Sequence, residues 1–423
     1  MNKNYRSIDL TTDNCIKCNI CTTACPVMKV TDLFIGPKYS GPQANRFRNI
    51  EDRLQEMSVD YCTGCRICNM VCPSNVNITE LNTKARAKLV DQGSFPFRIR
   101  LRNNIIARAE KLGQIAQPFH PFTNFFLRNK PTRLIIEKIL GISKEAPLPN
   151  FSPYKFTTWF RKHKTPNNTS RKVVYFHGCS TQYYEPRIGE AAVFVLEKNG
   201  FEVIVPQQNC CGLPLLSNGE FHSARKYHKN NVSKLIEWVD KGYSIVGTST
   251  SCTLTLKEEA PKLLDMTDRE TLKIAENTYD INEFLLLLLS EDTLNLDFQS
   301  ISFEIPYHIP CQYRAHLLGK PGIDILHLIP DLKIIDTEAD CCGIAGTYGY
   351  KKEKNQISSA IGNPLFEKIN KLNPSLIICD SETCRWQITH NTNIPAFHPV
   401  EILAVSYGYR TGQLFEKLKL ISK

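Results

Sequence analysis

Short apolar runs rich in β-branched residues recur through the second half of the chain and alternate with helix-period patterns. The runs predict strands at 173–176, 201–205, 244–248, 301–307, 332–335 and 375–379. The helical patterns fall at 187–199, 221–239 and 354–371. Such alternation is typical of α/β units with mainly parallel sheets. The most apolar run, 284–289, is shorter than the ~18 residues that span a membrane, so it predicts a buried helix and no transmembrane helix is expected.

The α/β part of the chain contains the same cysteine landmarks twice. The first copy has Cys179, a Cys-Cys-Gly triplet at 210–212 and a Ser-x-x-Cys tetrad at 249–252, and the second has Cys311, 341–343 and 381–384. Between the single cysteine and the pair lie 30 residues in one copy and 29 in the other, and between pair and tetrad 37 and 38. Agreement at three landmarks indicates an internal duplication.

Each copy offers four thiols after its strands, where the loops of a parallel sheet converge on sites. The candidate metal ligands are Cys179, Cys210, Cys211 and Cys252 in the first copy and Cys311, Cys341, Cys342 and Cys384 in the second. Adjacent cysteines are suited to neighbouring irons, which predicts one or two further iron–sulfur clusters, with zinc or plain core cysteines as alternatives. Cys379 lies inside an apolar strand and is interpreted as a buried hydrophobic residue, the alternative being a substitute ligand.

Two runs of the form C-x₂-C-x₂-C-x₃-C-P occupy the first 75 residues. In two-cluster ferredoxins the fourth cysteine of each such run ligates the other cluster. The prediction is one [4Fe–4S] cluster on Cys15, Cys18, Cys21 and Cys72 and a second on Cys62, Cys65, Cys68 and Cys25. Structural zinc, the alternative, prefers two C-x₂-C knuckles. A helix over 80–91, capped by Thr79 and stopped at Gly93, favours a helical ferredoxin domain.

Composition narrows the function classes. The polar stretch Met1–Leu10 does not resemble an export signal, so the 17 cysteines are expected in a reducing compartment as metal ligands.

The net charge is +10, and the segment from Phe97 to Lys164 alone has 14 Lys and Arg against three acids. Basic residues interleaved with apolar ones favour an anionic membrane surface or an acidic partner, with a helical hairpin packed on the α/β part as the alternative. Nucleic acid is not expected, because no nucleic-acid fold signature accompanies the charge.

These observations predict an α+β protein with four regions. They are a helical ferredoxin domain at 1–93, a basic connecting segment at 94–170, and duplicated α/β modules at 171–300 and 301–423. No G-x-G-x-x-G motif opens a helix after a strand, so a non-catalytic electron-transfer chain is expected. A catalytic reductase acting on a disulfide and a zinc-stabilised scaffold are the other two classes.

Longer motifs carry a family resemblance. They are Asn14–Val27, Gly36-Pro-Lys, Gly41-Pro, Tyr175–Cys179, Cys210–Leu215, Cys341–Glu353, Ala360–Phe366 and Ser381–Gln387. Together they resemble the C subunits of anaerobic glycerol-3-phosphate dehydrogenases over about residues 10–405, and 341–366 is the most specific stretch.

The resemblance implies an electron-transfer subunit in anaerobic respiration. Its partners would be FAD-containing dehydrogenase subunits that oxidise glycerol 3-phosphate to dihydroxyacetone phosphate, and its acceptor the membrane quinone pool. It would attach those subunits peripherally to the cytoplasmic side of the inner membrane. The alternative is an iron–sulfur subunit of a glycolate or lactate oxidase or of a heterodisulfide-reductase-like enzyme. Ser249 and Ser381 stand where that wider group often has cysteine, which counts against the special cluster of heterodisulfide reductase, because hydroxyl is a weaker iron ligand than thiolate.

Overall fold

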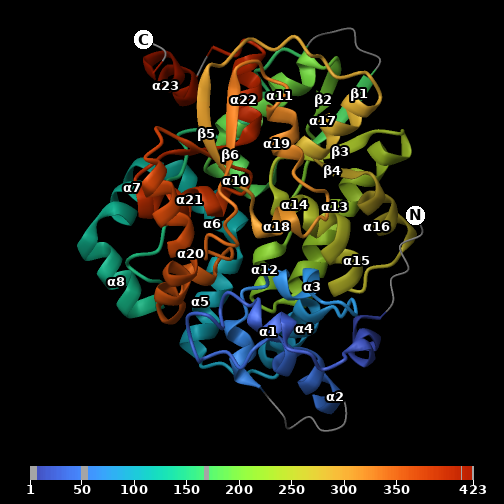
Figure 1. Cartoon of the computed structure of the whole chain (residues 1–423), viewed down its shortest axis with the longest axis vertical. Helices are drawn as coiled ribbons and strands as arrows, with labels where there is room; N and C mark the ends of the chain where they lie inside the picture. The colour runs from blue at the N-terminus through green and yellow to red at the C-terminus, as the bar shows by residue number, and fades with distance from the viewer. Residues whose placement is uncertain (1–6, 49–55, 166–170, 411, 422–423) are drawn as a thin grey trace.

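The computed structural model describes residues 7–48, 56–165, 171–410 and 412–421. Two four-stranded parallel sheets lie above a helical N-terminal region (Figure 1). The first, ordered β2-β1-β3-β4, consists of Arg171–Phe176 (β1), Phe201–Ile204 (β2), Ser244–Gly247 (β3) and Thr278–Asp280 (β4). The second, ordered β6-β5-β7-β8, consists of Phe303–His308 (β5), Leu332–Asp336 (β6), Ile377–Cys379 (β7) and Ala396–Phe397 (β8). The predicted pair of parallel α/β units is confirmed, with one strand order in both.

The six predicted strands are present, and their ends differ from the expected ones by no more than two residues. Strands β4 and β8 were not predicted, because their three and two residues do not lie in an apolar run of the kind that marks β7, which is also only three residues long. Strand β5 runs one residue further than expected and ends at His308. This brings His308 into the sheet, in register with Cys379 of β7.

The long helices of the α/β part match the sequence pattern closely. They are Pro186–Lys198 (α11), Phe221–Asp240 (α13) and Lys352–Leu372 (α20). The apolar run at 284–289 lies in helix α17, Ile281–Ser290, which begins with a capping box between Asp280 and Glu283. The other helices are Gly178–Tyr183 (α10), Leu213–Ser217 (α12), Thr250–Leu254 (α14), Ala260–Leu263 (α15), Arg269–Glu276 (α16), Cys311–Arg314 (α18), Pro321–Leu326 (α19), Glu382–Thr392 (α21), Pro399–Ser406 (α22) and Gln413–Ile421 (α23).

The two sheets share one hydrophobic core. Tyr175 of β1 and Tyr307 of β5 belong to the same buried cluster. Helix α11 of the first unit packs on α22 of the second, and α17 packs on α19. Buried ion pairs cross the same boundary, with Arg385 2.8 Å from Glu185. Burying a large apolar side chain such as that of Tyr175 or Tyr307 contributes about 1.5–3 kcal/mol. The shared core therefore fixes how the two units are placed.

The N-terminal region is built from short helices around the cysteine runs. They are Ile20–Thr23 (α1), Ala44–Arg48 (α2), Ile67–Met70 (α3) and Ile78–Asp91 (α4). The prediction that Thr79 caps the last of them was wrong, because α4 begins at Ile78 after Asn77. The Thr79 hydroxyl instead lies 3.2 Å from the Cys68 sulfur. Gly93 follows the helix at φ +70°, as its stop signal requires.

The basic connecting segment forms Phe97–Ala107 (α5), Ala109–Ala116 (α6), His120–Arg128 (α7), Lys130–Leu140 (α8) and Phe156–Phe160 (α9). Helices α7 and α8 lie at the outer edge of the molecule (Figure 1). Several arginines of the connecting segment form hydrogen bonds or ion pairs within the protein. Arg98 donates to the carbonyl of Ile139, Arg102 lies 2.7 Å from Glu353, Arg108 2.7 Å from Glu220, and Arg133 donates to the carbonyl of Ser143. Part of the positive charge therefore holds the segment in place. No helix in the described part of the chain is long and apolar enough to cross a membrane.

Candidate metal centres

The eight cysteines of the N-terminal runs gather in two groups that exchange their fourth members. Cys15, Cys18, Cys21 and Cys72 line one small cavity, and Cys25, Cys62, Cys65 and Cys68 line another. These are the two sets of cluster ligands that the ferredoxin pattern predicts. Lys17 and Gly64, each directly before the second cysteine of its run, adopt left-handed backbone with φ of 62° and 70°. The same turn thus presents the thiols of both runs.

Polar groups of helix α4 and the residues before it surround these sulfurs. The backbone N–H of Val76 donates to the Cys72 sulfur at 3.4 Å, and the side-chain amide of Asn82 donates to the Cys62 sulfur at 3.8 Å. Burial raises the pKa of the Cys25 thiol to about 11. Buried thiols of this kind lose their protons only when a metal binds them, and hydrogen bonds to the sulfurs tune the potential of the bound cluster.

The second N-terminal group touches the second α/β unit. Cys25, Cys311 and Cys341 belong to one buried cluster, and Cys62 and Cys65 pack against it. Burial and the neighbouring Cys341 raise the pKa of the Cys65 thiol. A second cluster, with Leu215 and Leu216 of α12, contains Cys21 of the first N-terminal group and also Cys68 of the second. Sequence spacing gave no indication of which group would face which unit.

Within each α/β unit the four predicted cysteines form a continuous chain of thiols. In the first unit Cys210 contacts Cys179 and Cys211, and Cys211 contacts Cys252. In the second, Cys341 contacts Cys311 and Cys342, and the Cys342 and Cys384 sulfurs are 2.9 Å apart. Hydrogen bonds from neighbouring thiols lower the pKa of Cys210 in the first chain and of Cys341 and Cys384 in the second. Four converging thiols fit a metal or cluster site, because thiolate is the form that binds iron.

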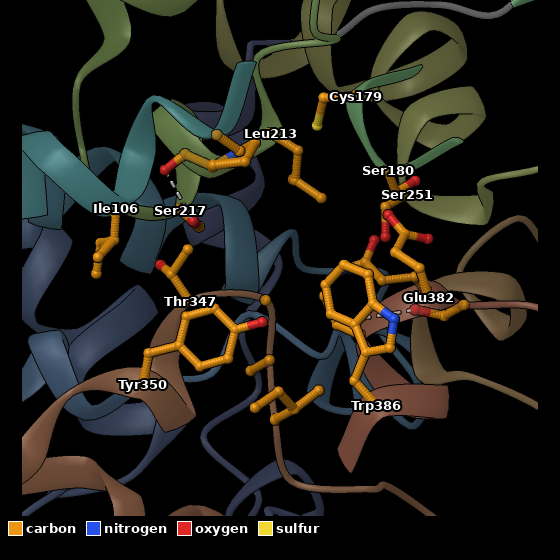
Figure 2. A pocket seen from close by; sticks show the side chains of 18 of the residues that line it. Ile106, Cys179, Ser180, Leu213, Ser217, Ser251, Thr347, Tyr350, Glu382 and Trp386 are labelled. Carbon is orange, nitrogen blue, oxygen red and sulfur yellow. Dashed lines mark hydrogen bonds between the residues drawn. The ribbon is translucent and has the colours of Figure 1, made fainter. Parts of the chain in front are cut away.

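Both thiol chains face one cavity of about 410 Å³. Its walls also contain Thr63 and Gly64 of the N-terminal region and apolar residues of α5 to α8. Figure 2 shows Cys179 and Glu382 on this cavity, with the rings of Tyr350 and Trp386 turned into the same space. A largely apolar cavity of this size fits a small organic molecule.

The serines of the two Ser-x-x-Cys tetrads differ in their contacts. Ser249 caps α14 by accepting a hydrogen bond from the Cys252 N–H, and its hydroxyl donates to Glu382 of the other unit at 3.2 Å. Ser381 has no such cap bond, and its hydroxyl lies 3.4 Å from that of Thr383. Burial raises the pKa of Glu382. Ser249 therefore has a structural task that joins the two units.

Sequence reasoning missed two residues beside the thiols, Glu110 and His308, and left the role of a third, Cys379, open. Glu110 of α6 accepts a hydrogen bond from the Cys210 N–H at 3.0 Å, so the connecting segment holds the first Cys-Cys-Gly loop. His308 lies close to Cys342 and Cys384. Cys379 is completely buried, as expected, but its thiol contacts that of Cys384. A histidine at the end of β5 was a visible signal, since the first copy has phenylalanine there.

Replacing the glycine of each Cys-Cys-Gly triplet by alanine is expected to lower stability by different amounts. Both have positive φ, 84° at Gly343 and 91° at Gly212, which costs an alanine about 1–2 kcal/mol. A Cβ on Gly343 would lie 1.9 Å from the Ser358 carbonyl oxygen, whereas on Gly212 the nearest atom is 3.6 Å away. We expect Gly343→Ala to lower the free energy of unfolding by about 2–5 kcal/mol and Gly212→Ala by about 1–2 kcal/mol, since overpacking adds about 1–3 kcal/mol. Denaturant unfolding of both variants measures this, and equal losses would contradict it.

Two ferredoxin-type cysteine groups, joined to two α/β units that each gather four thiols, define an iron–sulfur electron-transfer protein. Residues 11–76 match the 4Fe-4S dicluster domain, and residues 173–257 and 305–389 each match the Cysteine-rich domain. The chain belongs to the family formed by the C subunits of anaerobic glycerol-3-phosphate dehydrogenases. It is 36% identical over 402 residues to the family member of Escherichia coli, and the match covers 94% of this chain and 98% of the relative. The resemblance predicted from the motifs is confirmed.

More distant relatives match shorter parts of the chain. Lactate utilization protein A of Bacillus subtilis is 26% identical over 248 residues, covering 55% of this chain and 98% of that protein. The B subunit of the fumarate reductase (CoM/CoB) of Methanothermobacter marburgensis is 28% identical over 247 residues, covering 56% of this chain and 46% of that protein. The alternative, an iron–sulfur subunit of a lactate oxidase, therefore fits this chain less well than a C subunit of an anaerobic glycerol-3-phosphate dehydrogenase.

Proposed function

We propose that this chain accepts electrons from FAD-containing subunits that oxidise glycerol 3-phosphate and delivers them to the membrane quinone pool. The single observation that carries this is 36% identity over 94% of the chain to a subunit of that dehydrogenase. Two [4Fe–4S] clusters would be held by the two N-terminal cysteine groups and would carry single electrons. The four-thiol chains of the α/β units are the proposed sites of further clusters.

The placement of the cysteines supports an order for the path. The group of Cys25, Cys62, Cys65 and Cys68 lies beside the thiols of the second unit, because Cys25 and Cys65 are close to Cys341. We propose that electrons enter near Cys15, Cys18, Cys21 and Cys72 and leave through the α/β units. The apolar cavity beside both thiol chains is the proposed place of the quinone.

Co-purification tests the donor. The chain, tagged and produced anaerobically together with the flavoprotein subunits of an anaerobic glycerol-3-phosphate dehydrogenase, is expected to elute with them and to contain at least about eight irons. Glycerol 3-phosphate should bleach the iron–sulfur absorbance of this complex, and lactate should not. Bleaching by lactate, or elution without a flavoprotein, would sink this donor assignment. Zinc without sulfide would exclude electron transfer by this chain.

An exposed apolar set supports peripheral attachment to the membrane. Nine large apolar side chains of α5 to α8 and their connections are at least half exposed: Phe97, Ile115, Phe119, Phe122, Phe125, Phe126, Leu134, Ile135 and Ile139. Single exposed apolar residues are ordinary, but this density in one segment is typical of an interaction surface. The same helices turn other apolar residues, such as Ile106, Leu127 and Ile136, into the cavity. A lipid-soluble acceptor would thus meet apolar groups on both sides of these helices.

Polar substitutions in this set are expected to release the protein from membranes. Phe122 is 71% exposed and Phe125 62% exposed, so the double change Phe122→Ser and Phe125→Ser should leave folding intact. Losing two inserted rings costs at least about 3 kcal/mol, or about 100-fold in binding to anionic liposomes. Leu317, 77% exposed and outside the segment, provides the matched control Leu317→Ser, which should bind as the parent does. Sedimentation with liposomes measures both, and equal binding of parent and double variant would refute attachment through this set.

A further inference from the structure

The two α/β units differ at the carboxyl ends of their two central strands. In the first unit Phe176 ends β1 and is in register with Gly247, which ends β3. In the second unit the equivalent positions are His308 and Cys379, again in register with each other. The duplicated sheets thus have a phenylalanine and a glycine at these positions in one copy and two residues with metal-ligating side chains in the other. His177 of the first copy lies one residue beyond β1, its Nδ1 is 2.7 Å from the Gly178 carbonyl oxygen, and among the described residues it is not part of a group of metal-ligating side chains such as that around His308.

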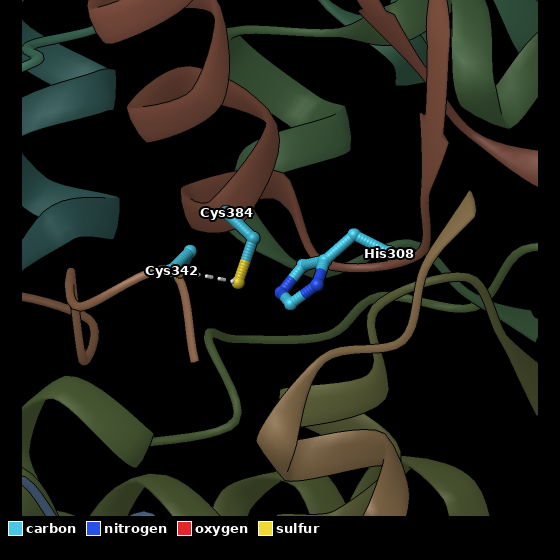
Figure 3. Close-up of side chains that lie close together, drawn as sticks. All are labelled: His308, Cys342 and Cys384. Atoms are coloured by element: carbon cyan, nitrogen blue, oxygen red, sulfur yellow. Dashed lines mark hydrogen bonds between the residues drawn. The ribbon is translucent and has the colours of Figure 1, made fainter. Parts of the chain in front are cut away.

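Both residues join the thiol chain of the second unit at the same end. One ring nitrogen of His308 and the sulfurs of Cys342 and Cys384 lie within 4.8 Å of one another, and all three residues are buried. Figure 3 shows the imidazole turned towards the Cys384 sulfur. The thiol of Cys379 contacts Cys384 from the strand below. The second unit therefore gathers six donor groups where the first gathers four.

The His308 ring is short of partners for a buried imidazole. It is completely buried, and its Nδ1 contacts the Thr337 hydroxyl at 3.4 Å. Its Nε2 makes no hydrogen bond of standard geometry among the described residues, although the Cys384 thiol contacts the ring. Leaving a buried polar group without a partner is unfavourable. A bond from Nε2 to a metal would offset this cost, and imidazole held at its other nitrogen is a common metal ligand.

We propose that the second unit binds an iron–sulfur centre with mixed ligands, in which His308 coordinates iron through Nε2 and Cys379 supplies a thiolate that Ser381 cannot. Six donors exceed the four that a structural zinc ion takes. Imidazole in place of thiolate raises the potential of an iron–sulfur centre. The centre of the second unit is then the more oxidising of the two and the place where electrons collect. This inference rests on the iron–sulfur part of the proposed function and on neither the glycerol 3-phosphate donor nor the membrane.

Isotope-edited pulsed EPR on the intact, anaerobically purified chain tests the proposal. Protein grown with natural histidine and with ¹⁵N-histidine is poised through a redox titration, so that each centre passes through its paramagnetic state. One centre is expected to show the nitrogen coupling of a bound imidazole, changed by the label. In His308→Phe, which installs the residue of the first copy, that coupling should vanish and the potential of the same centre should fall. Phe176→Leu, at the equivalent position of the first unit, should change neither.

Each other outcome counts against the proposal. Absence of histidine coupling from every centre of the parent protein, or its survival in His308→Phe, would show that His308 does not bind the metal. A parent protein with zinc in place of iron in this unit would overturn the iron assignment. Cys379→Gly, which installs the glycine that the first copy has at this position, is the second variant and tests the proposal if His308→Phe folds poorly. It should shift the potential of that centre and leave its histidine coupling in place, and an unchanged potential removes Cys379 from the ligand set. Failure to co-purify with a flavoprotein would leave all these results standing, so the two proposals fail separately.

Discussion

Replacing Cys25 by alanine is expected to damage the cluster of the other cysteine run. Cys25 belongs to the first run in sequence, but its thiol lies with those of Cys62, Cys65 and Cys68. Iron per chain should fall by between about one and about four atoms, because the cluster loses one corner or all of its irons. Electron transfer from donor to acceptor should fall to the background of the assay, since this is the N-terminal group that packs against the thiols of the second unit on the proposed path. Iron analysis, EPR and acceptor reduction measure the three effects.

The matched variants for this prediction are Cys65→Ala, Cys18→Ala and Cys72→Ala. The EPR spectrum of Cys25→Ala should resemble that of Cys65→Ala, because both residues line the same cavity. Cys72→Ala should resemble Cys18→Ala for the same reason. If Cys25→Ala instead reproduces the spectrum of Cys18→Ala, each run holds its own cluster and the crossed arrangement is wrong.

Replacing Lys354 by alanine is expected to destabilise the contact between the ferredoxin region and the second unit. Lys354 is buried on α20, forms an ion pair with the Asp60 carboxylate and donates to the Asp60 carbonyl at 2.6 Å. Burial opposes the charge on Asp60, but Lys354, Lys351 and Arg86 hold its pKa well below its usual range. Removing the lysine takes away the nearest cation and a hydrogen bond from a buried carboxylate that keeps Arg86 at 3.6 Å, so the free energy of unfolding should fall by up to about 3–5 kcal/mol. Urea unfolding of the cluster-loaded chain measures this.

Lys352, two residues away on the same helix, provides the control. Its ammonium lies 3.5 Å from Glu137, but the lysine side chain is 60% exposed. Exposed pairs contribute about 0–1 kcal/mol, so Lys352→Ala should change stability little. Similar losses in both variants would mean that burial of the Lys354–Asp60 pair is not what holds the two regions together.

Local patterns predicted most of the fold and the thiols. The two C-x₂-C-x₂-C-x₃-C-P runs place three thiols within one turn of backbone, so the groups around Cys18 and Cys65 follow from spacing alone. The repeated landmarks likewise predicted the two sheets and their four-thiol sets. Strands longer than three residues were visible because their apolar period is local.

Contacts between distant segments could not be predicted in this way. His308 is 34 residues before Cys342 and 76 before Cys384, and no motif spacing relates a strand end to those loops. The hydrogen bond from Ser249 to Glu382 joins different copies, so the sequence of one copy alone does not indicate the role of this serine. The arginines of the connecting segment were counted as surface charge, although Arg133 is buried against backbone carbonyls. Burial and long-range geometry decide these cases, and a linear pattern contains neither.

The core shared by the two sheets has a consequence for the speed of electron transfer. Tyr175 and Tyr307 lie in one packed cluster, and α11 and α22 are joined across it, so the two units cannot swing about a hinge as linked domains do. Packed interiors deform little. The separation between the two thiol chains is therefore a fixed property of the fold, insensitive to viscosity and crowding. Electron exchange between centres bound there should proceed at one rate in solution, on liposomes and within the assembled complex.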